Sequence, residues 1–202
     1  MDAPQALCRT FLAMPIAAYF QQDIQPLLDR IKHRWPGIKW VRAEQIHLTF
    51  HFFGNTTREE IQNIEAIIHP IALKTRNLHL GLHGLGFFPN DFKPRILWIG
   101  MVGDLEPLHK LQGQLESSLK AAGFPIEDRP FRAHVTIGRI RPAKRSSALS
   151  QPSGKPEIEF KTALQEINKL ILYQSFLSQQ GPRYETLKTF LFSRSEPLGP
   201  DN

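Results

Sequence analysis

Cysteine is almost absent from this chain of 202 residues, which contains only Cys8. One thiol cannot form an internal disulfide and cannot build a zinc site of several cysteines. Long hydrophobic runs are also missing, because no apolar stretch approaches the roughly 20 residues that cross a bilayer. The first residues carry no basic segment ahead of their apolar ones, so the sequence predicts no secretory signal, no membrane association and a cytoplasmic location.

Acidic residues are fewer than basic ones, 19 against 25, which gives a formal net charge of +6. A basic protein attracts polyanions such as nucleic acids by steering and counterion release. A basic surface that only keeps the protein in solution would have the same composition, so charge alone leaves both interpretations open. Hydrophobic residues make up 41% of the chain, which is ordinary for one globular domain or two small lobes.

Hydrophobic periodicity predicts alternating strands and helices. Helical patterns follow Pro15, the Thr57–Glu60 capping box and Asp104, which is expected to cap its helix. Pro26 is expected to kink or split the first helix, and Gly54-Asn55 to end the second strand. Strands are expected over residues 7–13, 46–53, 78–85, 96–102, 133–140, 166–173 and 184–192, loops over 86–94 and 142–156, and a loose tail over 196–202.

The two halves of the chain repeat one layout of strand, helix and histidine-containing strand. The layout starts at Leu7 and again at Pro94, 87 residues later, and 87 residues also separate His47 from His134. Side-chain identity across the repeat is poor, so the resemblance lies in the pattern. We therefore expect two similar lobes related by an approximate two-fold axis, each contributing one strand to a shared cleft.

Each of these two strands carries the same motif, His47-Leu48-Thr49-Phe50 in the first and His134-Val135-Thr136-Ile137 in the second. Side chains two residues apart on a strand share a face, so each histidine lies beside its threonine while the apolar residues pack behind. A lone His-x-Thr is usually incidental and a lone strand histidine usually structural. Two copies at equivalent places in a repeat favour a shared site.

Two imidazoles and two hydroxyls in one small volume suit the cleavage of a phosphodiester. Histidine has an unperturbed pKa of about 6.5, so one ring can be neutral and take a proton from water while the other is protonated and gives one to the leaving oxygen. The hydroxyls of Thr49 and Thr136 can donate to the phosphoryl oxygens. This scheme requires no metal and no cofactor.

His51 shares the face of His47 by the same alternation. It is expected either to widen the polar cleft and tune His47, or to be a solvated histidine at the rim. The two rings do not suggest a metal pair, because residues four apart on a strand are about 13 Å apart. No carboxylate or cysteine cluster joins them.

These motifs and their surroundings resemble the 2H phosphoesterase superfamily, and more closely the RNA 2′,3′-cyclic phosphodiesterases once described as 2′-5′ RNA ligases. The resemblance covers nearly the whole chain. It rests on Arg9-Thr10-Phe11, His47-Leu48-Thr49-Phe50, Phe53-Gly54, Leu97-Trp98-Ile99-Gly100, Arg129-Pro130-Phe131-Arg132-Ala133-His134-Val135-Thr136, Arg139, Leu172-Tyr173-Gln174-Ser175 and Arg183-Tyr184.

The resemblance implies an α+β fold of two lobes, with two antiparallel sheets flanking a central cleft and helices outside, over residues 1–195. It implies hydrolysis of an RNA or nucleotide 2′,3′-cyclic phosphate to a 2′-phosphomonoester, in which His47 donates the proton to O3′ and His134 activates water. The corresponding partners are RNA 3′ ends or small cyclic nucleotides. A monomer is expected, since both motifs lie in one chain.

Two further residues are candidate substrate contacts. Arg139 resembles the family's arginine after the second motif, but simple alternation turns it away from His134. A bulge or a strand end at Gly138 is expected to re-aim it toward the phosphate, the alternative being a solvated arginine at the end of the strand. Phe11 is a candidate for stacking on a base, although a core position is the more usual one for such a phenylalanine.

Three alternatives to hydrolysis remain open from the sequence. A binding module for RNA or nucleotides could use the same cleft without turnover. The reverse reaction could join RNA ends through a 2′-5′ linkage. A scaffold protein with incidental motifs is disfavoured by the matched spacing.

Overall fold

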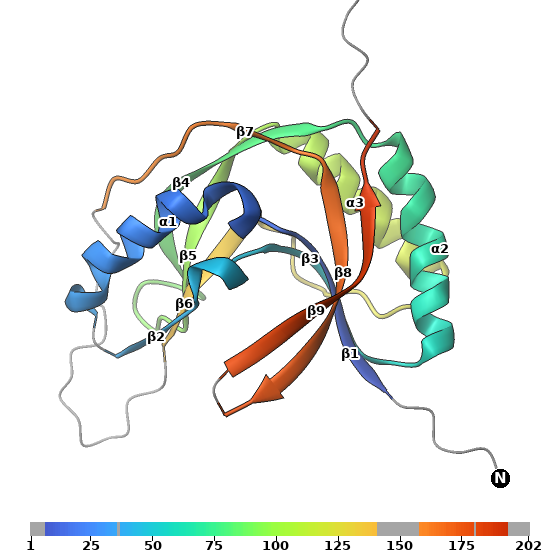
Figure 1. Ribbon diagram of the computed structural model, residues 1–202, viewed down its shortest axis with the longest axis horizontal. Helices are drawn as coiled ribbons and strands as arrows, with labels where there is room; N and C mark the ends of the chain where they lie inside the picture. Colours follow the sequence, from blue (N-terminus) through green and yellow to red (C-terminus); the bar gives the residue numbers. More distant parts are fainter. Residues whose placement is uncertain (1–6, 36, 141–157, 180, 194–202) are drawn as a thin grey trace, which may run out of the picture.

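The computed structural model describes residues 7–35, 37–140, 158–179 and 181–193 (Figure 1). The tail expected over 196–202 and the loop expected over 142–156 lie outside these ranges. The described elements, in chain order, are β1 (Cys8–Met14), α1 (Ala17–Ile31), η1 (Lys32–Arg34), β2 (Ile38–Trp40), η2 (Ala43–Gln45), β3 (Leu48–Thr56), α2 (Arg58–Lys74), β4 (Leu78–Phe88), β5 (Ile96–Gly103), α3 (Leu105–Ala121), β6 (His134–Ile140), β7 (Gln165–Ile167), β8 (Lys169–Ser178) and β9 (Gly181–Leu191).

The strands form two antiparallel sheets, which confirms the expected α+β class. One sheet has the order β3-β1-β8-β9 and the other β2-β6-β5-β4-β7. Figure 1 shows α1 on one side of the molecule and α2 with α3 on the opposite side. Each helix buries one stripe of apolar residues against a sheet, as an amphipathic helix must. In α1 this stripe consists of Phe20, Ile24, Leu27, Leu28 and Ile31.

The two lobes are not simply the two halves of the chain. The unit of strand, helix and histidine strand occurs twice as expected, as β1-α1-β3 and as β5-α3-β6. However, β4 from the first half pairs with β5, and β8 from the end of the chain pairs with β1. The short strand β2 also crosses over to pair with β6. These exchanges tie the lobes together through backbone hydrogen bonds.

The first helix continues across Pro26, so the expected split is wrong. Proline removes one backbone donor and leaves the carbonyl four residues earlier without its helical partner. Here both Pro26 and Gln22 lie on the exposed face of α1. Water can therefore bind the freed carbonyl, and the buried stripe is unaffected.

Strand β3 continues past Gly54-Asn55 to Thr56, so the expected break there is also wrong. Gly54 has φ of 76°, and the pairing with β1 shifts register beside it. A glycine in this conformation is typical of a β-bulge, which bends a strand without ending it. Beyond the bulge, the hydroxyl of Thr56 donates to the Cys8 carbonyl at 2.8 Å and holds the last pair.

One strand boundary and one helix cap differ from the prediction, and another cap is confirmed. Strand β4 runs to Phe88, into the expected loop, because its last residues pair with β5. Asp104 precedes α3 but its carboxylate accepts from the His79 N–H rather than from the helix. The Asp104 N–H donates to the His79 carbonyl, so this residue extends the β4–β5 ladder. The capping box of Thr57 and Glu60 is present at the start of α2.

Candidate active site

The two motif strands meet at the centre of the molecule, one from each sheet. Strand β3 contacts β6, and Figure 1 shows both near the middle of the fold. His47 immediately precedes β3 and His134 begins β6. The burial follows the expected alternation, with His47, Thr49, His134 and Thr136 partly exposed and Leu48, Phe50, Val135 and Ile137 buried.

Both histidines are held by the same kind of hydrogen bond. The Nδ1–H of His47 donates to the carbonyl of Gln45 at 2.7 Å, and the Nδ1–H of His134 donates to the carbonyl of Arg132 at 2.6 Å. A carbonyl oxygen can only accept, so Nδ1 must carry a proton in each ring. The two Nε2 atoms are left to accept or donate a proton during a reaction.

The surroundings of both imidazoles favour the neutral form. Burial lowers the pKa of His47 below its usual value, the hydrogen bond to Gln45 opposes this, and the charges of Arg139 and His134 lower it further. Burial also lowers the pKa of His134, against the hydrogen bond to Arg132, and the Arg132 charge adds to the lowering. The effect of Arg139 and His134 on the pKa of His47 indicates that their charges lie near this ring.

A β-bulge follows the threonine in each motif strand. In the pairing of β1 with β3, Leu12 faces His51 and Ala13 faces Thr49, so Phe50 is the extra residue. In the pairing of β5 with β6, Ile137 is the extra residue. Phe50 and Ile137 are again 87 residues apart. Because an extra residue reverses the alternation, different side chains face the cleft beyond each bulge.

The second bulge lies at Ile137, next to Gly138 where the sequence predicted one, and Arg139 follows it. Arg139 is exposed, and its charge lowers the pKa of both His47 and Tyr184. Glycine is required beside the bulge, since a Cβ on Gly138 would lie 2.5 Å from Cγ2 of Ile38 in β2. Strand β2 therefore packs directly against β6 at Gly138.

The first bulge removes His51 from the cleft, so its expected place beside His47 is wrong. His51 is only 9% exposed and its ring packs on Phe53, with centroids 4.6 Å apart. Burial lowers its pKa, while the carboxylates of Glu127 and Glu116 raise it. Glu116 lies on α3 and Glu127 follows that helix. Phe53 also packs on Phe124, just after α3, with ring centroids 5.6 Å apart, so His51 belongs to the packing between β3 and the segment that follows α3.

Phe52 takes the position that His51 was expected to hold. Its side chain is 49% exposed and its ring centroid lies 5.7 Å from that of Phe11. Phe52 and Arg139 are also 87 residues apart, so the repeat pairs these two positions. Simple strand alternation does not reveal this pairing, because it places both side chains on the face opposite the histidines. The two bulges thus present an aromatic ring from one lobe and a guanidinium from the other.

Phe11 is a core residue, so the expectation that it stacks on a base is wrong. It is 2% exposed and cannot take a base on its face. Its ring instead lies beneath those of His47, Tyr173 and Tyr184, with centroids 5.0, 5.2 and 5.0 Å away. Its counterpart by the 87-residue spacing is Trp98, whose ring lies 6.4 Å from His134. Each catalytic candidate is therefore backed by an aromatic side chain.

Comparison with known proteins identifies the family. The family model described as LigT like Phosphoesterase matches the chain twice, over residues 15–98 and over residues 99–184. The chain belongs to the LigT-like phosphoesterase family. Each match contains one of the two His-x-Thr motifs, so the two matches divide this LigT-like phosphoesterase as the two histidine motifs do.

Curated relatives and solved structures agree with this membership. The chain is 31% identical to the RNA 2′,3′-cyclic phosphodiesterase of Aeropyrum pernix, over 80% of this chain and 90% of that protein. It is 29% identical to the protein of the same name in Archaeoglobus fulgidus, over 90% and 99%. A Thermus thermophilus crystal structure superposes with a TM-score of 0.76 at 25% identity, over 93% and 100%. The fold of E. coli LigT matches with a TM-score of 0.71 at 23% identity, over 93% and 99%.

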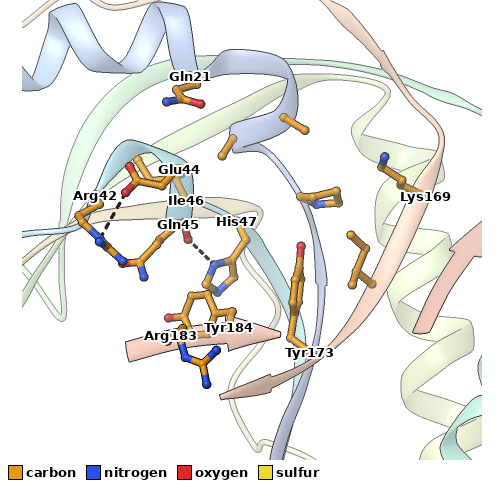
Figure 2. Close-up of a pocket in the computed structure, with 14 residues that line it drawn as sticks. Gln21, Arg42, Glu44, Gln45, Ile46, His47, Lys169, Tyr173, Arg183 and Tyr184 are labelled. Atoms are coloured by element: carbon orange, nitrogen blue, oxygen red, sulfur yellow. Dashed lines mark hydrogen bonds and ion pairs between the residues drawn. The ribbon is translucent and has the colours of Figure 1, made fainter. Parts of the chain in front are cut away.

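Beside His47 the LigT-like phosphoesterase has a pocket with a volume of about 520 Å³, here called the His47 pocket. It lies between the start of α1, the segment before β3 and the β8–β9 hairpin (Figure 2). The side chain of Gln45 donates to the carbonyl of Pro182 at 2.6 Å and ties that segment to the hairpin. Its lining includes Arg42, His47, Lys169, Tyr173, Arg183 and Tyr184.

The described ranges contain neither a cluster of metal-ligand residues nor a helix that could span a membrane. Among those residues, no three of His, Cys, Asp and Glu come together as metal ligands would. No described helix is both long and apolar enough to span a bilayer.

Proposed function

We propose that this LigT-like phosphoesterase hydrolyses 2′,3′-cyclic phosphate ends of RNA or nucleotides to 2′-phosphomonoesters. The observation that carries the proposal is the matched pair of imidazoles, each fixed through Nδ1 by a backbone carbonyl two residues upstream. This arrangement leaves two Nε2 atoms, one from each lobe, to serve as acid and base. The name shared by the curated relatives supports the same reaction.

In the proposed reaction both proton transfers occur at one phosphorus. Neutral His134 takes a proton from water through Nε2 while the water oxygen attacks phosphorus. The bond from phosphorus to O3′ breaks, and protonated His47 gives its Nε2 proton to that oxygen. The products are a 2′-phosphate and a free 3′-hydroxyl, and a second proton exchange with water restores both rings.

Three other side chains are proposed to bind the phosphate. The hydroxyls of Thr49 and Thr136 share the exposed faces of the two histidines and can donate to the non-bridging oxygens. Arg139 brings a guanidinium, whose planar array of donors fits two phosphate oxygens at once. Together they would stabilise the charge that builds up on these oxygens in the transition state.

The pH dependence of kcat/KM is expected to be bell-shaped with its optimum below pH 6.5. Activity falls on the acid side as the base His134 becomes protonated, and on the alkaline side as the acid His47 loses its proton. Both pKa values are lowered in the free enzyme, mainly by burial, and kcat/KM reports the free enzyme. Initial rates from pH 4 to 9 test this, and an optimum above pH 7 would contradict it.

Phe52 is proposed to stack on the base of the substrate. Replacing it by alanine should raise KM for adenosine 2′,3′-cyclic phosphate about fivefold or more and leave kcat within about twofold, since a stacked base contributes roughly 1–3 kcal/mol to binding. Phe92 is 92% exposed and does not line the His47 pocket, so Phe92→Ala is the control for loss of an exposed phenylalanine. A Phe52→Ala enzyme with unchanged KM would show that this ring does not meet the base.

One assay tests the proposed function against its alternatives. Purified protein is incubated in EDTA with adenosine 2′,3′-cyclic phosphate, and the product is identified by chromatography against both isomers. Adenosine 2′-phosphate is the expected product. Binding without product would favour a module that has lost turnover, and a 3′-phosphate would contradict the assignment of O3′ as leaving group. Incubation with a 2′,3′-cyclic RNA end and a 5′-hydroxyl end reveals any joining by the reverse reaction.

The domain, the oligomeric state and the location of the protein are part of the same proposal. Residues 1–195 would form one catalytic domain, because each sheet contributes one histidine and the strand exchanges join the two sheets. A monomer in the cytoplasm, with RNA 3′ ends or small cyclic nucleotides as partners, fits a site built from a single chain.

A further inference from the structure

We propose that the His47 pocket binds the phosphate on the 5′ side of the nucleotide whose cyclic phosphate is opened. This inference rests on the proposed function, since it takes His47 as the group nearest O3′. It predicts that substrates with a 5′-phosphate, including RNA ends, are bound better than a nucleoside 2′,3′-cyclic phosphate that lacks one.

The direction of the substrate follows from the direction of the reaction. Water attacks phosphorus opposite the leaving O3′, so the base His134 and the acid His47 lie on opposite sides of the phosphorus. O3′ stays on the ribose, which places the sugar on the His47 side. The 5′ carbon and its phosphate therefore extend beyond His47, where the pocket begins, because His47 itself lines it.

The charge of the pocket suits a phosphate. Arg42 is paired with Glu44 at 3.3 Å and Arg183 is paired with Glu185. Within the part of the chain that the structure describes, Lys169 forms no ion pair, although it is partly buried in the pocket wall. A partly buried ammonium group without a carboxylate attracts an anion, and lysine binds phosphate well as a point charge.

The walls of the pocket suit the rest of a nucleotide. Tyr173 and Tyr184 both pack on Phe11 and line the pocket, where their rings offer apolar faces. Burial raises the pKa of Tyr173 to about 12, so its hydroxyl stays neutral and can donate to a phosphate oxygen. Figure 2 shows Tyr173 and Lys169 on one side of the pocket and Arg42 with Glu44 on the other.

The first test measures binding alone, so it does not depend on turnover. Dissociation constants of adenosine 2′-phosphate and adenosine 2′,5′-bisphosphate are compared by calorimetry. The bisphosphate should bind at least about tenfold more tightly, as expected for one hydrogen bond to a charged group. Equal affinities would overturn the inference.

Lysine variants separate the pocket from the general attraction of a basic protein. Lys169→Gln should abolish most of the advantage of the bisphosphate, whereas Lys188→Gln, an exposed lysine on β9 outside the pocket, should retain it. Both variants lose one charge, and equal melting temperatures confirm that both fold. An equal loss in the two variants would mean that the pocket plays no specific part.

Turnover then distinguishes the sources of the phosphate and separates this inference from the proposed function. Rates are compared for adenosine 2′,3′-cyclic phosphate, its 5′-phosphorylated form and a dinucleotide with the same cyclic end. A gain for both of the larger substrates points to the phosphate group itself, and a gain for the dinucleotide alone points to RNA. Equal rates for all three contradict the inference only, and no hydrolysis of any contradicts the proposed function.

Discussion

Alanine at His47 or at His134 is expected to lower kcat for 2′,3′-cyclic phosphate hydrolysis by about 10²–10⁴-fold, with a much smaller change in substrate affinity. Each substitution removes one of the two proposed proton-transfer groups, whose ring is oriented by a hydrogen bond from Nδ1 to a backbone carbonyl. Single-turnover kinetics and calorimetric binding of adenosine 2′-phosphate separate the two effects.

The matched control is His69→Ala, because His69 is an exposed histidine on α2. The double variant of His47 and His134 should lose little more than either single variant, since an acid and a base that act in one step are not additive. Turnover in either single variant equal to that of the parent protein would refute the assignment.

The second large effect is expected at Arg139. Replacing it by glutamine should lower kcat/KM by roughly 10–100-fold, as expected when a charge-assisted hydrogen bond worth about 1.5–3 kcal/mol is lost. Lysine at this position should restore only part of the loss, because an ammonium group cannot bind two oxygens in the planar geometry of guanidinium. Steady-state kinetics on adenosine 2′,3′-cyclic phosphate measure all three enzymes.

Arg58→Gln controls for the loss of one positive charge, because Arg58 is exposed in the first turn of α2. It should leave kcat/KM within about twofold. If Arg139→Gln also changed kcat/KM by less than twofold, the guanidinium would not contact the phosphate, and the bulge at Ile137 would not turn it toward the two histidines.

Local pattern predicted the parts of the site that depend on local geometry. Alternation along a strand gave the faces of His47, Thr49, His134 and Thr136, because the two-residue period holds up to each bulge. The capping box at Thr57 was predictable for the same reason, since its hydrogen bonds join residues three apart.

Features that depend on long-range pairing were not predictable. Nothing in the local pattern of residues 38–40 indicates that they pair with β6, or that β8 pairs with β1. The bulge at Phe50 arises from the register between β1 and β3, and it exchanged the expected places of His51 and Phe52. At the equivalent bulge in β6, Gly138 indicated from the sequence that the strand could be irregular. Phe50 and its neighbours in β3 include no such residue.

The most direct test of the central claim is a crystal structure of the protein with adenosine 2′-phosphate. The two-histidine mechanism predicts Nε2 of His47 and Nε2 of His134 within about 2.6–3.2 Å of oxygens on the same phosphorus. A phosphate held by only one of the two rings, with the other turned out of the cleft, would contradict it.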